Sequence, residues 1–376
     1  MPDGSSLGGN AALLTGHRKG RGAVSNPKVR FDRTGTEAFD DGWETLAEEF
    51  AALPPLATTL TRDASRSAMA WNDSPDIGFD RSLNPYRGCE HGCVYCFARP
   101  SHAYLGLSPG LDFETKLIFK PELATLLEKE LRKPGYTPRP VAIGSNTDPY
   151  QPVERTLKIT RQVLEVLERF NHPVAIVTKS AGVLRDIDIL SRMAAKGLVQ
   201  VAISVTTLDA KLARLMEPRA ATPERRLHAI ETLAKAGIPA GVLAAPMIPG
   251  LNDAELERIL ERAAVMGASR AGYVILRLPL EIASLMEEWL HTHYPDRAAR
   301  VLALIRQTRG GQIYDSRFGE RMKGSGPYAE LLANRFRVAA TRLGLNQTRG
   351  AKLNCELFKV PEDPNAAAKP AQMALF

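Results

Sequence analysis

Long apolar runs are missing from this chain of 376 residues, and we expect no secretory leader. No segment approaches the run of about 18 apolar residues that a membrane-spanning helix needs. The N-terminal residues lack the layout of a signal peptide, because Leu13 and Leu14 stand alone among small polar residues. We therefore expect a cytoplasmic protein with no membrane partner.

Cysteine is also scarce, with only four residues in the chain. Four cysteines are too few for a disulfide scaffold in a chain of this length. Hydrophobic residues make up 44% of the sequence and charged residues 24%, which excludes a mainly disordered chain. Three of the four cysteines, Cys89, Cys93 and Cys96, fall within eight residues of one another, and such clustering is typical of metal chemistry.

The charge is only moderately positive, at +7 for the whole chain. Basic side chains gather in residues 1–30, where the charged residues are Asp3, Arg18, Lys19, Arg21, Lys28 and Arg30. A basic, glycine-rich arm of this kind can touch the phosphates of DNA. The alternative is a solvated tail with no partner.

Short apolar runs alternate with amphipathic stretches from residue 82 onward. We predict strands over 82–87, 141–145, 174–178, 200–206, 241–247 and 272–277. We predict helices between them over 121–131, 155–169, 183–195, 222–236 and 253–266. Six strands that alternate with helices imply an α/β fold with a parallel sheet, right-handed crossovers and a curved or barrel-like shape.

The composition divides the chain into four segments. Residues 1–80 form a basic extension, with disorder expected over 1–30 and one helix over 42–53. Residues 81–280 form the α/β core. Residues 281–360 form a helical extension with helices over 281–290, 296–307 and 328–343, and residues 361–376 form a flexible tail.

The cysteine cluster has the spacing C-x3-C-x2-C and comes directly after the first predicted strand. Three thiolates on one tight loop can hold three irons of a 4Fe–4S cluster and leave the fourth iron open. Gly88 and Gly92 let the backbone wrap closely around such a cluster, because they carry no Cβ.

Two other interpretations of the cysteine cluster remain open. A zinc site could use His91 or His102 as its fourth ligand, although zinc motifs usually bring a second pair of ligands. The cysteines could also be ordinary core residues, but the polar neighbours Arg87 and Glu90 argue against this.

The spacing and position of the motif resemble those of the radical S-adenosylmethionine (radical SAM) superfamily. The resemblance covers about residues 82–277 and implies a partial (β/α)6 barrel of the TIM type, flanked by flexible N- and C-terminal extensions. In that family the open iron binds the methionine part of S-adenosylmethionine. A reductant such as flavodoxin or ferredoxin then supplies the electron that generates a 5′-deoxyadenosyl radical, which abstracts hydrogen from the substrate.

Polar residues follow several predicted strands, at the edge where parallel βα units place their reaction centre. Thr147 and Asp148 follow the second strand, Lys179 follows the third, and Ser204 ends the fourth. These four residues resemble those that contact S-adenosylmethionine in spore photoproduct lyase. For any one of them, the alternative is a polar residue that merely begins a loop.

Three further residues carry the same resemblance. Tyr95 and Phe97, on either side of Cys96, resemble aromatic positions near the adenine in spore photoproduct lyase. Arg219 is a candidate partner for the carboxylate of S-adenosylmethionine, with solvation at the surface as the alternative.

One feature of the lyase is missing. The lyase carries a cysteine just ahead of its Thr/Ser–Asp pair that returns hydrogen to the thymine radical, whereas this chain has Ser145 and Asn146 there. Thymine-dimer reversal by that route is therefore not expected. Cys355 is a candidate replacement, although a buried structural cysteine is the favoured interpretation.

The C-terminal residues Gln372–Phe376 resemble the peptide with which bacterial repair proteins dock on the sliding clamp. A chance match is the alternative for so short a motif. The favoured function is therefore radical SAM chemistry of a lyase-like kind on DNA or another nucleic acid. The alternatives are the same chemistry on a protein or small metabolite, and a non-catalytic iron–sulfur or zinc-binding module.

Overall fold

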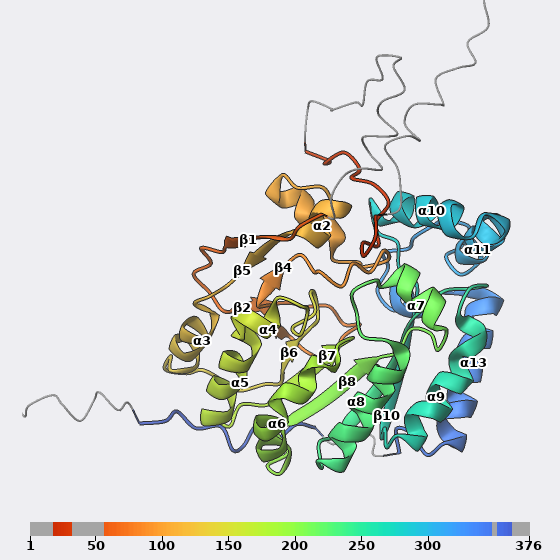
Figure 1. The fold of residues 1–376 in the computed structure, drawn as a ribbon. Helices are drawn as coiled ribbons and strands as arrows, with labels where there is room; N and C mark the ends of the chain where they lie inside the picture. The colour runs from red at the N-terminus through yellow and green to blue at the C-terminus, as the bar shows by residue number, and fades with distance from the viewer. Residues whose placement is uncertain (1–17, 32–55, 348–351, 363–376) are drawn as a thin grey trace, which may run out of the picture.

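The computed structural model describes residues 18–31, 56–347 and 352–362, and its main feature is one seven-stranded sheet (Figure 1). Six of its strands are parallel and stand side by side in chain order. They are β3 (Arg81–Leu83), β6 (Val141–Ile143), β7 (Val174–Thr178), β8 (Val199–Ser204), β9 (Ala240–Met247) and β10 (Arg270–Ile275). The seventh strand, β2 (Met69–Trp71), pairs antiparallel with β3. This arrangement confirms the expected α/β fold with a partial (β/α)6 barrel.

Helices connect the strands and cover the outer face of the sheet (Figure 1). The connecting helices are α3 (Leu123–Leu131), α4 (Glu154–Leu157), α5 (Ile159–Arg169), η2 (Ala181–Asp186), α6 (Ile187–Ala194), α7 (Ala210–Met216), α8 (Pro223–Lys235), η3 (Asp253–Glu255) and α9 (Leu256–Val265). Their apolar faces bury leucine, isoleucine and valine against the Val- and Ile-rich strands. Local signals set their ends: Thr222 caps α8 by accepting a hydrogen bond from the Arg225 N–H, and Gly237 follows the helix with a φ of +72°.

In the described part of the chain, four helices follow the last parallel strand. They are α10 (Ile282–His293), α11 (Pro295–Gln307), α12 (Glu320–Lys323) and α13 (Gly326–Arg342). Trp289 of α10 and Ile305 of α11 are fully or almost fully buried in a second apolar cluster, which also contains Cys93 and Tyr95. The C-terminal helices therefore pack close to the cysteine motif rather than apart from it.

The first predicted strand, 82–87, is wrong in its extent. The chain forms β3 and then leaves the sheet, because Pro85 has no N–H to donate to a ladder. The next strand, β4 (Tyr86–Arg87), instead joins β5 (Lys116–Phe119) and β1 (Thr59–Arg62) in a separate three-stranded sheet. The predicted helix over 155–169 is also divided in two, because Lys158 adopts a φ of +52° between α4 and α5.

Residues 18–31 pack against the core, so the disorder expected over 1–30 is wrong for residues 18–30. Arg21 belongs to the basic arm for which phosphate contact or a solvated tail was expected, but it is only 3% exposed. Its guanidinium donates hydrogen bonds to the Glu114 carbonyl at 2.9 Å and to the Leu56 carbonyl at 2.5 Å. The helix predicted over 42–53 and the peptide Gln372–Phe376 lie outside the described residues. Within the described residues, no helix is long and apolar enough to cross a membrane.

Candidate cluster and cofactor site

The cysteine loop, which we define as residues 88–96, follows β4 and presents three free thiols. Cys89 and Cys93 are buried, and Cys96 is half-buried. The loop is fixed by main-chain hydrogen bonds from Cys89 N–H to the Phe113 carbonyl at 3.0 Å and from Cys96 N–H to the Cys93 carbonyl at 3.2 Å. Three thiols are thus held on one compact loop, as a cluster with three protein ligands requires.

Two glycines in this loop are required by its shape. Gly88 has a φ of +78° and Gly92 a φ of +68°, a region that other residues rarely adopt. A Cβ on Gly88 would lie 2.8 Å from the Phe113 carbonyl oxygen, and one on Gly92 would lie 2.7 Å from Oε2 of Glu114. The loop therefore approaches neighbouring groups more closely than a side chain would permit.

A buried carboxylate, Glu114, ties the loop to the N-terminal strap, which we define as residues 18–31. Its carboxylate accepts hydrogen bonds from the N–H groups of Gly22 at 3.0 Å and Ala23 at 2.8 Å. It also pairs with the fully buried guanidinium of Arg99 at 2.5 Å, and Arg99 donates in turn to the Cys93 carbonyl at 2.8 Å. A carboxylate this deeply buried is stable only because all these donors satisfy it. Sequence analysis missed Glu114, because its partners are distant in the chain.

The environment of the thiols opposes their ionisation in the absence of metal. Burial raises the pKa values of Cys89, Cys93 and Cys96. The Asp148 N–H, which hydrogen-bonds to Cys89, and the charge of Lys179 near Cys93 and Cys96 act in the opposite direction. Amide donors and a nearby cation stabilise thiolates once metal replaces their protons, so these residues fit a 4Fe–4S cluster.

The contacts of the two candidate histidines argue against the zinc alternative. His102 Nε2 hydrogen-bonds to the Lys116 carbonyl at 3.0 Å, and its ring packs edge-on against Phe113. His91 Nδ1 lies 3.4 Å from Oδ2 of Asp148. In the described part of the chain, no three His, Cys, Asp or Glu side chains are grouped to hold a metal ion. Zinc draws its ligands onto a single ion, whereas a cluster spreads them over separate irons.

Asp148 lies at the carboxyl edge of the strands, but its carboxylate is occupied within the protein. Oδ1 accepts hydrogen bonds from the Tyr150 N–H at 2.9 Å and the Thr178 hydroxyl at 2.7 Å, and Oδ2 accepts one from the Lys179 N–H at 2.7 Å. Burial alone would raise the pKa of Asp148, but His91, the Lys179 N–H and the Thr178 hydroxyl lower it to about 2. Asp148 thus joins the ends of β6 and β7 to the cysteine loop.

The other predicted cofactor contacts differ in how deeply their side chains are buried. Thr147 and Ser204 are buried, and the Thr147 hydroxyl donates to the Tyr86 carbonyl at 2.9 Å. Lys179 Nζ lies 5.7 Å from the ring centroid of Tyr95, which brings these two candidates together beside the cysteine loop. Phe97 is 46% exposed, and its ring lies 5.2 Å from the guanidinium of Arg277 just beyond β10.

A buried network around Glu217 holds Tyr95 in place. The Tyr95 hydroxyl and the Arg226 guanidinium both bond to the Glu217 carboxylate, and the Thr206 hydroxyl donates to it at 2.6 Å. Burial raises the pKa of Glu217, while the charge of Arg226 opposes that rise. The sequence analysis missed this network, because no local pattern connects Glu217 to Tyr95, Thr206 and Arg226.

Comparisons with known proteins agree with this geometry. The sequence profile of the radical SAM superfamily matches residues 83–263. An uncharacterised protein of Mycobacterium tuberculosis is 35% identical over 302 residues, which cover 80% of this chain and 83% of that protein. The chain belongs to the radical SAM superfamily. An uncharacterised protein of Methanocaldococcus jannaschii is 28% identical over 173 residues, 46% of this chain and 62% of that protein.

Solved structures show a similar fold for this radical SAM protein. Spore photoproduct lyase complexed with dinucleoside spore photoproduct superposes with a TM-score of 0.55 at 16% identity, over 76% of this chain and 80% of the lyase. A point mutant of the same lyase gives a TM-score of 0.56 at 16% identity, over 84% and 87% of the two chains. At this level of identity the likeness shows a shared fold.

The structure also places two other residues that the sequence analysis singled out. Arg219, a candidate for the carboxylate of S-adenosylmethionine, forms an ion pair with Glu90 at 3.0 Å. Cys355, expected to be buried, is half-buried, and the neighbouring Asn354 N–H bonds to the carbonyl of Gly197, which precedes β8. Cys355 is therefore at the amino end of the strands, opposite the cysteine loop, and cannot serve there as a hydrogen donor.

Proposed function

We propose that this radical SAM enzyme uses a 4Fe–4S cluster and S-adenosylmethionine to abstract hydrogen from a nucleic acid. The observation that carries the proposal is the position of the cysteine loop, which Asp148 and Lys179 join at the carboxyl edge of the parallel strands. Reaction centres of parallel βα folds lie at this edge. The fold shared with a lyase that binds a dinucleoside photoproduct supports nucleic acid as the substrate class.

In this proposal Cys89, Cys93 and Cys96 hold the cluster. When bound, the cluster supplies one electron for reductive cleavage of S-adenosylmethionine to a 5′-deoxyadenosyl radical. An external reductant such as flavodoxin or ferredoxin delivers that electron. The Lys179 ammonium, with its charge close to two of the cysteines, binds the cofactor carboxylate.

The remaining side chains position the cofactor and exclude water. Tyr95, fixed by Glu217, and the exposed ring of Phe97 flank the adenine. Ser204 and Thr147 line the strand ends, where their burial keeps solvent away. Asp148 acts as a positioning residue, since its carboxylate already accepts hydrogen bonds from this chain.

The final hydrogen transfer of this enzyme differs from that of spore photoproduct lyase. The residues ahead of Thr147 are Ser145 and Asn146, neither of which releases a hydrogen atom as a thiol does, and Cys355 lies at the opposite end of the strands. A cysteine at this position therefore cannot return hydrogen to the product radical, as it does in the lyase.

Isotope transfer tests the substrate class directly. The enzyme is reconstituted anaerobically and incubated with S-adenosylmethionine, dithionite and a uniformly deuterated oligonucleotide. Deuterium in the 5′-deoxyadenosine supports hydrogen abstraction from the nucleic acid. Rapid turnover with no deuterium transfer would point instead to a protein or small-metabolite substrate.

Recruitment to DNA through a sliding clamp is a separate proposal that depends on the motif Gln372–Phe376 alone. Its leucine and phenylalanine would fill an apolar pocket while the glutamine bonds at the rim. Deletion of these five residues should abolish capture on purified clamp and leave iron content unchanged. Equal capture of full-length and truncated chains would contradict it.

A further inference from the structure

A cavity of about 330 Å³ opens next to the cysteine loop. Its lining comes from the segments that follow β6, β7 and β8, together with His91 of the loop itself. The Arg219 N–H donates to the His91 carbonyl at 3.3 Å, which joins the cavity wall to the cysteine loop. Lys179, Tyr95 and Phe97, the proposed contacts to S-adenosylmethionine, are absent from its lining, so this cavity is distinct from the proposed cofactor site.

Three arginines, Arg155, Arg219 and Arg225, give the cavity its charge, and its lining contains no Asp or Glu. Arg219 is paired with Glu90 at 3.0 Å. The side chains of Arg155 and Arg225 are exposed and have no hydrogen-bond or ion-pair partner among the described residues. The cavity, which we call the arginine cavity, therefore presents two uncompensated guanidinium groups.

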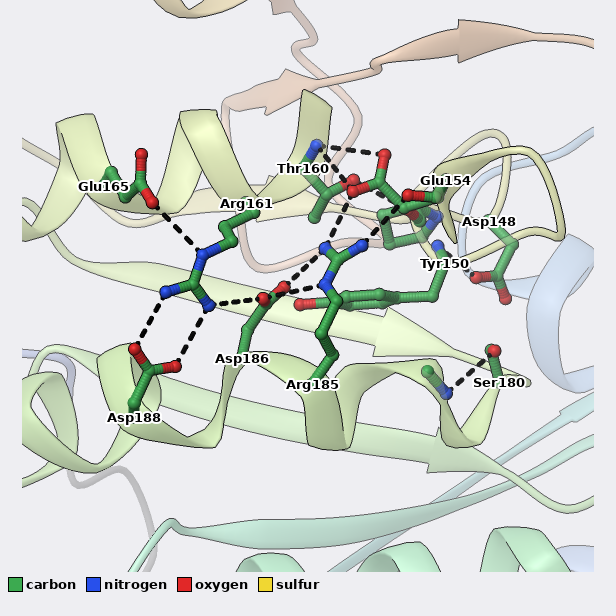
Figure 2. Close-up of polar contacts among 12 residues, drawn as sticks. Asp148, Tyr150, Glu154, Thr160, Arg161, Glu165, Ser180, Arg185, Asp186 and Asp188 are labelled. Carbon is green, nitrogen blue, oxygen red and sulfur yellow. Dashed lines mark hydrogen bonds and ion pairs between the residues drawn. The ribbon is translucent and has the colours of Figure 1, made fainter. Parts of the chain in front are cut away.

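Two other arginines, Arg185 and Arg161, are held by carboxylates, as Figure 2 shows. A second cavity of about 250 Å³ adjoins the first, and its Arg185 is held at 2.8 Å by both Glu154 and Asp186. Arg161 is held in the same way by Asp186 and Asp188, each at 2.9 Å. Acidic partners are thus provided for these arginines but not for Arg155 and Arg225.

We propose, building on the nucleic-acid substrate proposed above, that the arginine cavity binds a phosphodiester group of that substrate. A guanidinium group offers two parallel N–H donors that match phosphate oxygens. The volume of the cavity is sufficient for a phosphate and part of its sugar. Because His91 belongs to both the cavity and the cysteine loop, a phosphate held here fixes the nucleic acid beside the reaction centre.

The test uses the full-length holoenzyme and a fluorescent DNA oligonucleotide. The double variant Arg155→Ala, Arg225→Ala removes both unpaired cations from positions that are exposed, so the fold does not depend on them. Arg300→Ala is the matched control, because it removes an exposed arginine on α11 that has no partner in the described part of the chain. Affinity is measured by fluorescence anisotropy over a range of salt concentrations.

The double variant should bind DNA about tenfold or more weakly, and its log–log salt slope should fall by about one for each phosphate that is no longer neutralised. The control should bind as the wild type does. The variant Arg155→Ala, Arg225→Lys should recover part of the DNA affinity that the double alanine variant loses, because lysine still offers a cation. Wild-type affinity and salt slope in the double variant would overturn the proposal.

Two further readouts separate this inference from the proposed function. Iron content and 5′-deoxyadenosine formation in the absence of DNA should be the same in the double variant and the wild type. Loss of either in the double variant would show that the arginines support the fold or the cofactor, and would overturn the phosphate assignment. Binding of inorganic phosphate or a nucleoside monophosphate that depends on the arginines, with unchanged DNA binding, would assign the cavity to a small phosphorylated ligand and also overturn it.

Discussion

The carbonyl oxygen of Gly92 lies 1.8 Å from the point that a Cβ on Gly22 would occupy. The N-terminal strap and the cysteine loop therefore meet backbone to backbone, with Glu114 bonded to the strap and in close approach to the loop. Any residue other than glycine at position 22 must move one of the two segments. The strap thus supports the loop that carries the cluster cysteines.

Gly22→Ala should displace the strap and loosen the cysteine loop. We expect a loss of about 1–3 kcal/mol in stability, as for overpacked sites, and faster loss of iron in air. Gly78→Ala is the control, because a Cβ on Gly78 meets no atom within 4 Å and its φ is not positive. Thermal unfolding and iron release over time give the readout. Similar behaviour of the two variants would show that the strap does not support the loop.

The strap illustrates a limit of sequence analysis. Residues 18–30 were predicted to be disordered because glycine and basic residues dominate their composition. Their burial depends on Glu114 and Gly92, which no local pattern connects to Gly22. Local composition therefore gave the wrong answer where long-range contacts decide the structure.

The ligand set is tested by replacing each cysteine. Cys89→Ala, Cys93→Ala and Cys96→Ala should each reduce bound iron and sulfide to near background, because three thiolates are the minimum for a site-differentiated cluster. Cys355→Ala should retain full iron content, since Cys355 lies at the amino end of the strands. Iron and sulfide analysis of anaerobically prepared protein decides the matter. Loss of iron from the Cys355 variant would mean that the ligand set is misassigned.

Lys179 and Asp148 should differ in their effects although they are neighbours at the strand ends. Lys179→Ala should keep the cluster and weaken S-adenosylmethionine binding by about 1–3 kcal/mol, because it removes one polar partner. Asp148→Ala should instead lower the amount of bound iron, because it removes the carboxylate that joins His91 to the end of β7. Iron analysis combined with calorimetric titration of S-adenosylmethionine distinguishes the two. Full iron content in the Asp148 variant would restore a direct cofactor role.

Acid should destabilise the fold through His172. Burial lowers the pKa of His172 to about 4, and the ring nitrogens bond to the Tyr136 hydroxyl at 2.8 Å and the Pro173 carbonyl at 3.0 Å. The unfolded chain binds this proton near the ordinary histidine pKa of about 6.5, so the unfolded state gains protons first as the pH falls. The contribution of His172 to the free energy of unfolding is therefore complete above about pH 6.5. It is lost as the pH falls toward 4, by up to about 3 kcal/mol.

Denaturant unfolding at several pH values checks this prediction. The wild type should lose stability steeply between pH 6.5 and 4, whereas His172→Gln, which has no titrating group, should show a flatter profile from a lower starting stability. Parallel pH profiles for the two proteins would contradict the assignment to His172.

The fold and the position of the cysteine loop could be predicted from the sequence, because each depends on a local pattern. Apolar runs separated by amphipathic stretches located the six parallel strands, and C-x3-C-x2-C identified the cysteine loop. The break between β3 and β4 was missed, although Pro85 marked it. The Glu217 network was missed because its members, Tyr95, Thr206 and Arg226, come together only in the folded chain.

Formation of 5′-deoxyadenosine is the most direct test of the central claim. Anaerobically reconstituted protein is reduced with dithionite, supplied with S-adenosylmethionine and analysed by mass spectrometry, beside the Cys93→Ala variant. We predict that the wild type forms 5′-deoxyadenosine and that the variant forms none. A wild type that binds a full cluster yet forms no more 5′-deoxyadenosine than the variant would contradict a radical SAM function for this protein.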